Sequence, residues 1–233
     1  MAIRPIFIPE PKGGLVDEAM VEFEWFPGFA VVQKQRSIES LHAAAIETLG
    51  VGRLLEASTK SPDPLGVRLS AFNLSVEVDG EPNPVLLEAA FQGSKVFATQ
   101  GPFTHLYEVK DGRAVKRFMN ELPDDQLTGF RFEGRDWPLS PRTAFYDWLY
   151  LNALREIVGQ DDQVEEAIFG VDGFTDIEFN PEKSINCQAR SSALFVALTK
   201  NGTLIDALTD PDAFIEVLTS HGYGIEPVQG QLL

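Results

Sequence analysis

The stretch LLEAAFQGSK at residues 86–95 places Glu88, Gln92 and Lys95 in an otherwise largely apolar helical pattern. Gln92 follows Glu88 by four residues and Lys95 follows it by seven, so all three return to nearly the same face of a helix. Glu88 and Lys95 are then about 10 Å apart along the axis, too far for a salt bridge between adjacent turns. Such a helix is either an ordinary amphipathic surface helix or the wall of a site, and its spacing leaves both interpretations open.

The rest of the chain predicts a mixture of short strands and helices. We expect strands at 3–9, 21–26 and 53–59, a strand pair or one bent strand at 67–78, and a strand followed by a loop at 131–141. We expect helices at 37–49, ending at Gly50, at 143–158 after Pro141, at 186–199, and from Pro211 to the glycines at 222 and 224. Loops are expected at 58–67 and 174–184. Without βαβ regularity or a dividing linker, the sequence predicts an α+β fold in a single domain spanning 1–233.

The charge of the chain limits the kinds of partner that it binds. Its 233 residues carry 19 Lys and Arg against 35 Asp and Glu, a formal net charge of -16. That balance argues against strong binding of nucleic acid through phosphate neutralisation, although a nucleic acid held by one modified nucleotide stays compatible with it. Taken alone, the charge is better explained by solubility. A single cysteine, no apolar run of membrane-spanning length and no export signal predict a cytoplasmic protein without membrane association.

Familiar nucleotide-binding, nucleophile and metal-binding motifs are absent from the sequence, which predicts no metal and no cofactor. Cys187 has no evident histidine partner and is interpreted as a small buried apolar residue. A polar cluster does precede the helix expected at 186–199, where Asp176, Asn180 and Asn186 lie close in sequence. Backbone N–H groups at a helix start suit a phosphate, whereas spacing alone favours a simple polar cap.

Two segments resemble the NADAR family, whose YbiA-like members carry F-S-N-F, a turn, and then E-H-Y-x-Q-x-x-K. LSAFNLSVEVDG followed by LLEAAFQGSK is similar to that pattern, and DIEFNPEKSINCQA is similar to the family's later D-x-x-W-G…G-x-N-x-L-G. Ala89 stands where the family has His, Phe179 where it has Trp, and the glycines of the later loop are absent. The resemblance spans about residues 66 to 200. It implies a NADAR/YbiA-like α+β fold, predominantly helical, with a small sheet and a β-containing N-terminal extension over residues 1–60.

The resemblance also implies an activity, the hydrolysis of an N-glycosidic bond, and a set of site residues. Glu88 and Lys95 take the catalytic positions. The positions expected to bind the ligand are Ser70, Phe72, Asn73, Phe91, Gln92, Asp176, Phe179 and Asn186. Lys60 is a further candidate, although an exposed lysine in a loop is more often simply solvated.

The N-terminal 60 residues resemble the NADAR subfamily encoded beside DarT-type guanine ADP-ribosyltransferase toxins. The resemblance therefore implies an antitoxin that removes ADP-ribose from guanine in DNA, expected to be single-stranded, with the toxin as a further partner. Two alternatives remain: an N-glycosidase acting on phosphoribosylamino intermediates of riboflavin synthesis, and a non-catalytic ADP-ribose-binding module. Glu88 and Lys95 do not separate the two enzymes, whereas their joint presence speaks against the binding module.

Overall fold

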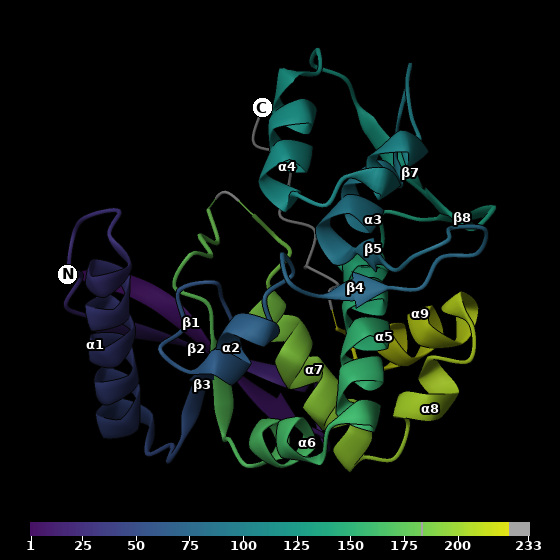
Figure 1. Ribbon diagram of the computed structural model, residues 1–233. Helices are drawn as coiled ribbons and strands as arrows, with labels where there is room; N and C mark the ends of the chain where they lie inside the picture. Colours follow the sequence, from purple (N-terminus) through teal and green to yellow (C-terminus); the bar gives the residue numbers. More distant parts are fainter. Residues whose placement is uncertain (183, 224–233) are drawn as a thin grey trace, which may run out of the picture.

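The structure, a computed structural model, describes residues 1–182 and 184–223 and confirms the α+β fold, with helices predominating over small separate sheets (Figure 1). The strands are β1 (Ala2–Glu10), β2 (Leu15–Phe23), β3 (Leu54–Glu56), β4 (Ser75–Val76), β5 (Val85–Leu86), β6 (Lys95–Phe97), β7 (Leu127–Phe132), β8 (Arg135–Trp137) and β9 (Gly173–Thr175). The helices are α1 (Val31–Leu49), α2 (Pro64–Arg68), α3 (Leu87–Gly93), the 3₁₀ helix η1 (Thr104–Glu108), α4 (Gly112–Glu121), α5 (Ala144–Gln160), α6 (Asp162–Phe169), α7 (Gln188–Lys200), α8 (Leu204–Ala207) and α9 (Pro211–Ser220). No helix within these two described ranges is long and apolar enough to cross a membrane.

A four-stranded sheet in the order β2-β1-β9-β3 lies between helices α1 and α7 (Figure 1). β1 and β2 pair antiparallel over their whole length, and β9 is inserted between β1 and the parallel strand β3. Successive side chains of a strand point to opposite faces, so Ile6 packs in the cluster beneath α1 while Phe7 packs in the larger core with α7. Because β9 immediately precedes residue 176, this sheet sets the starting point of the polar segment before α7.

The remaining elements assemble around α5 and α7. Tyr150 of α5 is fully buried, and its hydroxyl donates to the carbonyl of Leu69 at 2.6 Å, which fixes the chain after α2 against α5. Helix α3 packs against α4, α5 and η1, and the antiparallel sheet β6-β7-β8 lies beside it. Figure 1 shows α3, α4 and this sheet grouped together at the top, away from α1.

The long helices lie close to their predicted positions. The helix expected at 37–49 is α1, which begins earlier, at Val31, and ends where Gly50 adopts a left-handed φ of 69°. The helices expected at 143–158 and 186–199 are α5 and α7, and the helix expected from Pro211 is α9. α9 ends at Ser220, and Gly224, included in that prediction, lies outside the described residues.

The strand pair or bent strand predicted at 67–78 is wrong, as is the continuous loop at 58–67. Asp63 caps α2 by accepting a hydrogen bond from the Leu65 N–H at 2.9 Å, and Pro64 occupies the first turn of the helix. The chain then turns, and the Ala71 N–H donates to Gln188 Oε1 at 2.8 Å. Only residues 75–76 form a strand. The alternating apolar residues of this segment are therefore explained by a turn packed on the core rather than by an extended strand.

The helix predicted across 86–95 is shorter than expected, which moves Lys95 off it. α3 ends at Gly93, and Lys95 begins β6, where it pairs with Phe130 of β7. Pairing with a neighbouring strand thus overrides the helical spacing at the end of the stretch. Other strand boundaries also differ from the predictions. β2 covers 15–23 instead of 21–26, and β3 covers 54–56 instead of 53–59.

The strand and loop predicted at 131–141 contain part of the β7-β8 hairpin. The loop predicted at 174–184 begins inside β9, and its residue Lys183 lies outside the described residues.

Candidate active site

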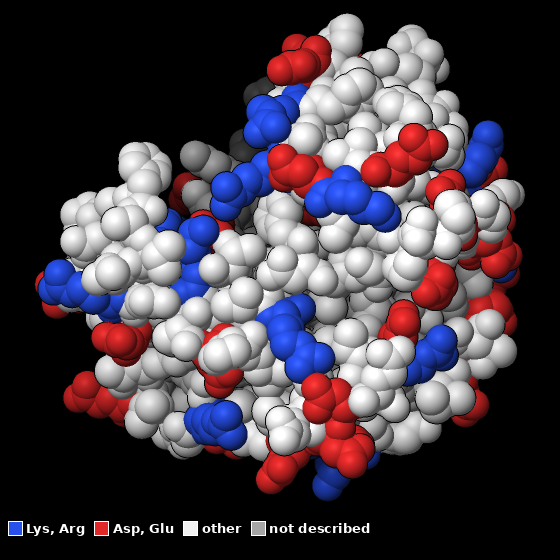
Figure 2. Space-filling model, in the orientation of Figure 1, with Lys and Arg blue, Asp and Glu red and all other residues white. Residues whose placement is uncertain are grey.

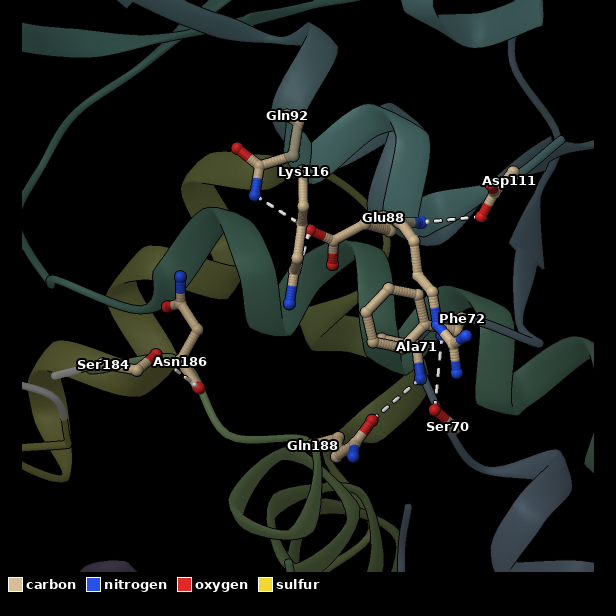
Figure 3. A network of polar contacts seen from close by, with 11 residues as sticks. Ser70, Ala71, Phe72, Glu88, Gln92, Asp111, Lys116, Ser184, Asn186 and Gln188 are labelled. Carbon is tan, nitrogen blue, oxygen red and sulfur yellow. Dashed lines mark hydrogen bonds and ion pairs between the residues drawn. The ribbon is translucent and has the colours of Figure 1, made fainter. Parts of the chain in front are cut away.

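Glu88 lies in the first turn of α3 with its side chain 5% exposed. Its Oε1 accepts a hydrogen bond from Gln92 Nε2 at 2.9 Å and lies 3.8 Å from Lys116 Nζ (Figure 3). All seven residues of α3 are buried, so the carboxylate is held on a rigid, dehydrated support. A carboxylate kept out of water beside one ammonium group interacts strongly with any positive charge that develops nearby.

Lys116 belongs to α4, which the sequence analysis did not identify. Its Nζ lies 4.6 Å from the centre of the Phe72 ring, so the side chain crosses that ring to reach Glu88. Gly112 permits this close packing, because a Cβ there would lie 3.5 Å from Glu88 Cβ and would collide with Phe72. The sequence did contain a signal for α4: Asp111 is its N-cap, and Val115, Phe118, Met119 and Leu122 follow helical spacing and pack on the core.

The segment after β9 supplies the opposite side of the site. Asp176 Oδ1 accepts hydrogen bonds from the N–H groups of Glu178 and Phe179 at 3.0 and 3.2 Å, which is an Asx turn. Burial, and next the nearby Glu56 carboxylate, raise the pKa of Asp176 to about 8. At neutral pH this side chain is therefore largely protonated and is able to donate a hydrogen bond.

Glu56 holds that segment in place from beneath. It is 1% exposed and accepts hydrogen bonds from Ser58 Oγ at 2.6 Å, Thr175 Oγ1 at 2.7 Å and the Ile177 N–H at 2.8 Å. Two of these donors flank Asp176 directly. Glu56 was not among the predicted site residues, and its signal in the sequence is a single carboxylate within the apolar strand LLE of β3.

Asn186 lies just before α7, whose N-cap is Cys187. Its Oδ1 is buried and has no hydrogen-bond partner among the described residues, and Figure 3 shows its side chain on the opposite side of the site from Phe72. Such an oxygen is costly to leave unpaired, which makes it a ready acceptor for a ligand hydroxyl. Cys187 itself is 2% exposed, as expected for a buried apolar residue, and burial raises its pKa.

These residues border three adjoining cavities that share Lys116. The central chamber, about 270 Å³, is lined by Ser70, Phe72, Glu88, Lys116, Asp176, Phe179, Asn186 and neighbouring residues. The aromatic cleft, about 850 Å³, is lined by Phe91, Gln92, Lys95, Phe97, Phe130 and others, and it shares Ser184 and Asn186 with the chamber. The basic groove, about 680 Å³, is lined by Lys60, Phe72, Asn73, Lys110, Arg113, Glu178 and others. The chamber thus brings together six of the ten positions expected from the sequence.

The other four positions lie in the flanking cavities. Phe91 packs against Phe130 and Tyr146, at ring-centre distances of 5.4 and 5.3 Å, and its remaining surface lines the aromatic cleft with Gln92 and Lys95. Asn73 is exposed, lines the basic groove, and donates from Nδ2 to a backbone carbonyl.

Lys95 lies over the Phe91 ring, with Nζ 5.2 Å from the ring centre. Burial lowers the pKa of Lys95, the Glu88 carboxylate opposes that shift, and the Lys116 ammonium adds to it. The charges of Glu88 and Lys116 therefore both affect Lys95. Lys95 nevertheless lines the aromatic cleft rather than the central chamber. A lysine with a lowered pKa has a larger neutral, nucleophilic fraction at a given pH.

Comparison with protein families gives a match over nearly the whole chain. The family model of the DarT1-associated NADAR antitoxins matches residues 2–224, which includes the N-terminal strands as well as every residue of the three cavities. A search of curated proteins finds no match to the chain. Since the family model covers nearly the whole sequence, the chain belongs to the family of DarT1-associated NADAR antitoxins.

Proposed function

We propose that the protein hydrolyses the N-glycosidic bond between ADP-ribose and guanine in DNA, and in this way acts as antitoxin to a DarT1-type toxin. The observation that carries the proposal is the buried Glu88 carboxylate beside Lys116, in a chamber that shares lining residues with a larger cavity on either side. A substrate with a sugar at its centre and a large group on either side matches that arrangement. The family of DarT1-associated antitoxins supports the same assignment.

In this proposal Glu88 acts on the ribose whose C1″ is bonded to guanine. The bond breaks with its electron pair on the guanine nitrogen, which takes up a proton, while the ribose acquires positive oxocarbenium character. The carboxylate of Glu88 stabilises that charge and accepts a proton from the water that adds to C1″. The products are unmodified guanine in the DNA strand and ADP-ribose.

Lys95 is assigned a covalent role in the same reaction. Its neutral amine attacks C1″, and guanine leaves with the bonding pair and takes up a proton, which gives a glycosylamine. The ribose ring then opens as the C1″–O4″ bond breaks and O4″ takes up a proton, and water hydrolyses the resulting imine to ADP-ribose and the free lysine. The lowered pKa favours Lys95 for this role, whereas the ion pair with Glu88 suits Lys116 for stabilising charge. The lysine that forms the imine can be identified directly, by borohydride reduction during turnover and peptide mapping. Reduction at Lys116 or Lys60 instead would reassign the nucleophile.

The polar side chains of the chamber are assigned to the ribose. Protonated Asp176 donates to one hydroxyl, and the unpaired Oδ1 of Asn186 accepts from another. The aromatic cleft is assigned to the ADP portion, with Phe97 and Phe130 toward the adenine. Phe179 packs against Phe7 in an edge-to-face arrangement at a ring-centre distance of 6.2 Å and also lines the chamber, so it is assigned to contact the sugar or the base.

The test is release of ADP-ribose from a single-stranded oligonucleotide that carries one ADP-ribosylated guanine. We expect Glu88→Gln to lose at least about 100-fold in rate while still binding ADP-ribose, because the amide keeps the shape but not the charge. Lys95→Arg keeps the charge but not the nucleophile and should also be inactive. Glu47→Gln, on the exposed face of α1, is the matched control and should retain full activity.

Other outcomes favour the alternatives. Binding of ADP-ribose without release by the wild type would indicate a binding module, and neither binding nor release would direct attention to small phosphoribosylamino substrates. The 850 Å³ of the aromatic cleft favours the larger ADP-ribose adduct over such a metabolite. Full activity of Lys95→Arg would remove the covalent role while leaving the hydrolase assignment intact.

Co-expression with the toxin tests the antitoxin role. Wild type should restore growth of cells that express the toxin, and Glu88→Gln should not, because reversal of the DNA modification requires hydrolysis. Rescue by Glu88→Gln at equal expression would show that the protein acts by binding the toxin instead.

A further inference from the structure

The basic groove carries an unusual concentration of positive charge for this chain. Lys60, Lys110 and Arg113 line it together with Lys116, in a protein whose formal net charge is -16. In Figure 2 blue side chains gather over α4 and along the hollow between α4 and α1. A local positive field on an acidic molecule attracts anions to that place alone.

The two carboxylates that line the groove are already engaged. Asp111 accepts a hydrogen bond from the Arg113 N–H through Oδ1, and its Oδ2 lies 3.8 Å from Arg117. Glu178 accepts from Thr59 Oγ1 at 3.3 Å. Two of the cations are oriented by neutral partners, since Lys110 Nζ donates to the Pro84 carbonyl at 3.0 Å and Lys60 Nζ to Thr59 Oγ1 at 3.2 Å. Four cations against these two carboxylates give the groove a net positive charge, and hydrogen bonds hold Lys60 and Lys110 in place.

The lining of the groove suits phosphate groups better than a base. Among the described residues that line it, Phe72 is the one aromatic side chain, and the Lys116 ammonium lies over that ring. The aromatic cleft on the other side of the chamber has several aromatic and aliphatic side chains instead. Bases bind by stacking on exposed aromatic faces, whereas backbone phosphates need only placed cations.

We propose that the basic groove binds the phosphodiester backbone of the strand next to the modified guanine, through Lys60, Lys110 and Arg113. The inference rests on the proposed function, because it assigns the groove to the DNA side of the scissile bond and the aromatic cleft to the ADP side. The guanine enters the chamber from the groove, past Lys116, which borders both. A few local contacts of this kind orient the strand, while the negative charge of the remaining surface keeps overall DNA affinity low.

Hydrolysis of two substrates separates strand binding from chemistry. One is an oligonucleotide with a single ADP-ribosylated guanine, and the other is ADP-ribosylated deoxyguanosine without flanking nucleotides. Wild type is compared with Lys110→Gln/Arg113→Gln and with the control Lys12→Gln/Lys200→Gln, which removes two exposed cations that are not among the lining residues of the groove. The groove variant should lose kcat/KM on the oligonucleotide only. For that substrate its plot of log kcat/KM against log salt should be shallower by about 1.4, from about 0.7 per phosphate contact to a single strand.

Other results would overturn the inference. Equal loss on both substrates would assign the groove to the pyrophosphate of ADP-ribose, and an unchanged groove variant would show that the strand does not use it. Fluorescence anisotropy with an unmodified single-stranded oligonucleotide at low salt tests the groove without catalysis, and weaker binding by the groove variant supports it. A wild type that binds this oligonucleotide through the groove but releases no ADP-ribose would refute the proposed hydrolase and retain the groove.

Discussion

Asp176 shows how a single residue in this site depends on a neighbour that is distant in sequence. Its carboxyl lies in the central chamber, while Glu56 lies beneath the same backbone segment, and burial raises the pKa of both. Two carboxyl groups this close and this buried resist being ionised together. Family resemblance suggested Asp176 as a site residue, but its protonation state follows first from its burial and next from Glu56, on strand β3.

The pH dependence of stability tests this pairing. The pKa of Asp176 is about 8 in the folded protein and about 4 when unfolded, so between these values the folded state binds the extra proton. Its contribution to the free energy of unfolding is fully present below about pH 4 and falls as pH rises toward 8, with a slope of up to about 1.4 kcal/mol per pH unit. We expect wild type to lose stability between pH 7 and 8.5 more steeply than Asp176→Asn.

Urea denaturation at intervals across that range measures the difference. His42 contributes little to the pH dependence in this range, because burial lowers its pKa to about 4 in the folded protein and its ordinary pKa is about 6.5, both below pH 7. Asp124→Asn, on the exposed surface, serves as control and should follow the wild type. Parallel curves for wild type and Asp176→Asn would contradict the raised pKa.

At the scale of elements, length separates most of what could be predicted from what could not, with the ten-residue helix α4 as an exception that was missed. α1, α5, α7 and α9 contain two to five turns with helical periodicity, and their positions were close to the predictions. α2, β4, β5 and α3 have two to seven residues each, and partners elsewhere in the chain determine them. Lys95 illustrates this: the local pattern places it on a helix, but pairing with Phe130 makes it part of a strand.

Gly66 lies at the contact between the short helix α2 and the short strand β3. It is buried in α2, and a Cβ at this position would lie well inside contact distance of the Glu56 carbonyl oxygen and of Ser61 Oγ. Gly66→Ala should therefore cost on the order of 1–3 kcal/mol of unfolding free energy, or more if β3 shifts. Because β3 also carries Glu56, hydrolysis should decline with it.

Gly159 provides a matched comparison in the last turn of α5. No atom lies within 4 Å of a Cβ built there, and alanine favours the helix over glycine by up to about 1 kcal/mol. Chemical denaturation of the two variants should then show opposite signs, with Gly159→Ala as stable as the wild type or more so. Destabilisation of similar size in both would contradict the packing described for α2 and β3.

At the scale of the whole molecule, the excess of carboxylates is the dominant electrostatic feature. A formal net charge of -16 on 233 residues produces repulsion that opposes the compact state. Salt should therefore have opposite effects on stability and on binding. It screens the repulsion between the surface carboxylates, which stabilises the fold, and it weakens the attraction of the basic groove for phosphates.

Thermal unfolding at increasing concentrations of potassium chloride tests whether the net negative charge destabilises the folded protein. Between about 20 and 200 mM the midpoint should rise by roughly 2–4 °C, which corresponds to on the order of 1 kcal/mol for a chain of this size. Chloride is preferred to sulfate, because sulfate also strengthens apolar burial. A midpoint that falls with salt would show that favourable ion pairs outweigh the net repulsion.

The sequence by itself determined the α+β class and the long helices, because periodicity is a local property, and through resemblance it suggested Glu88, Asp176 and Asn186, which line one chamber. It did not reveal Lys116 or Glu56, and it placed Lys95 on the wrong element. The tertiary structure decided these features, since α3, α4 and the segment before α7 meet only through packing between distant parts of the chain. An ion pair between two such helices cannot be recognised from the spacing of its residues in the sequence, because the packing of the core sets the distance between its atoms.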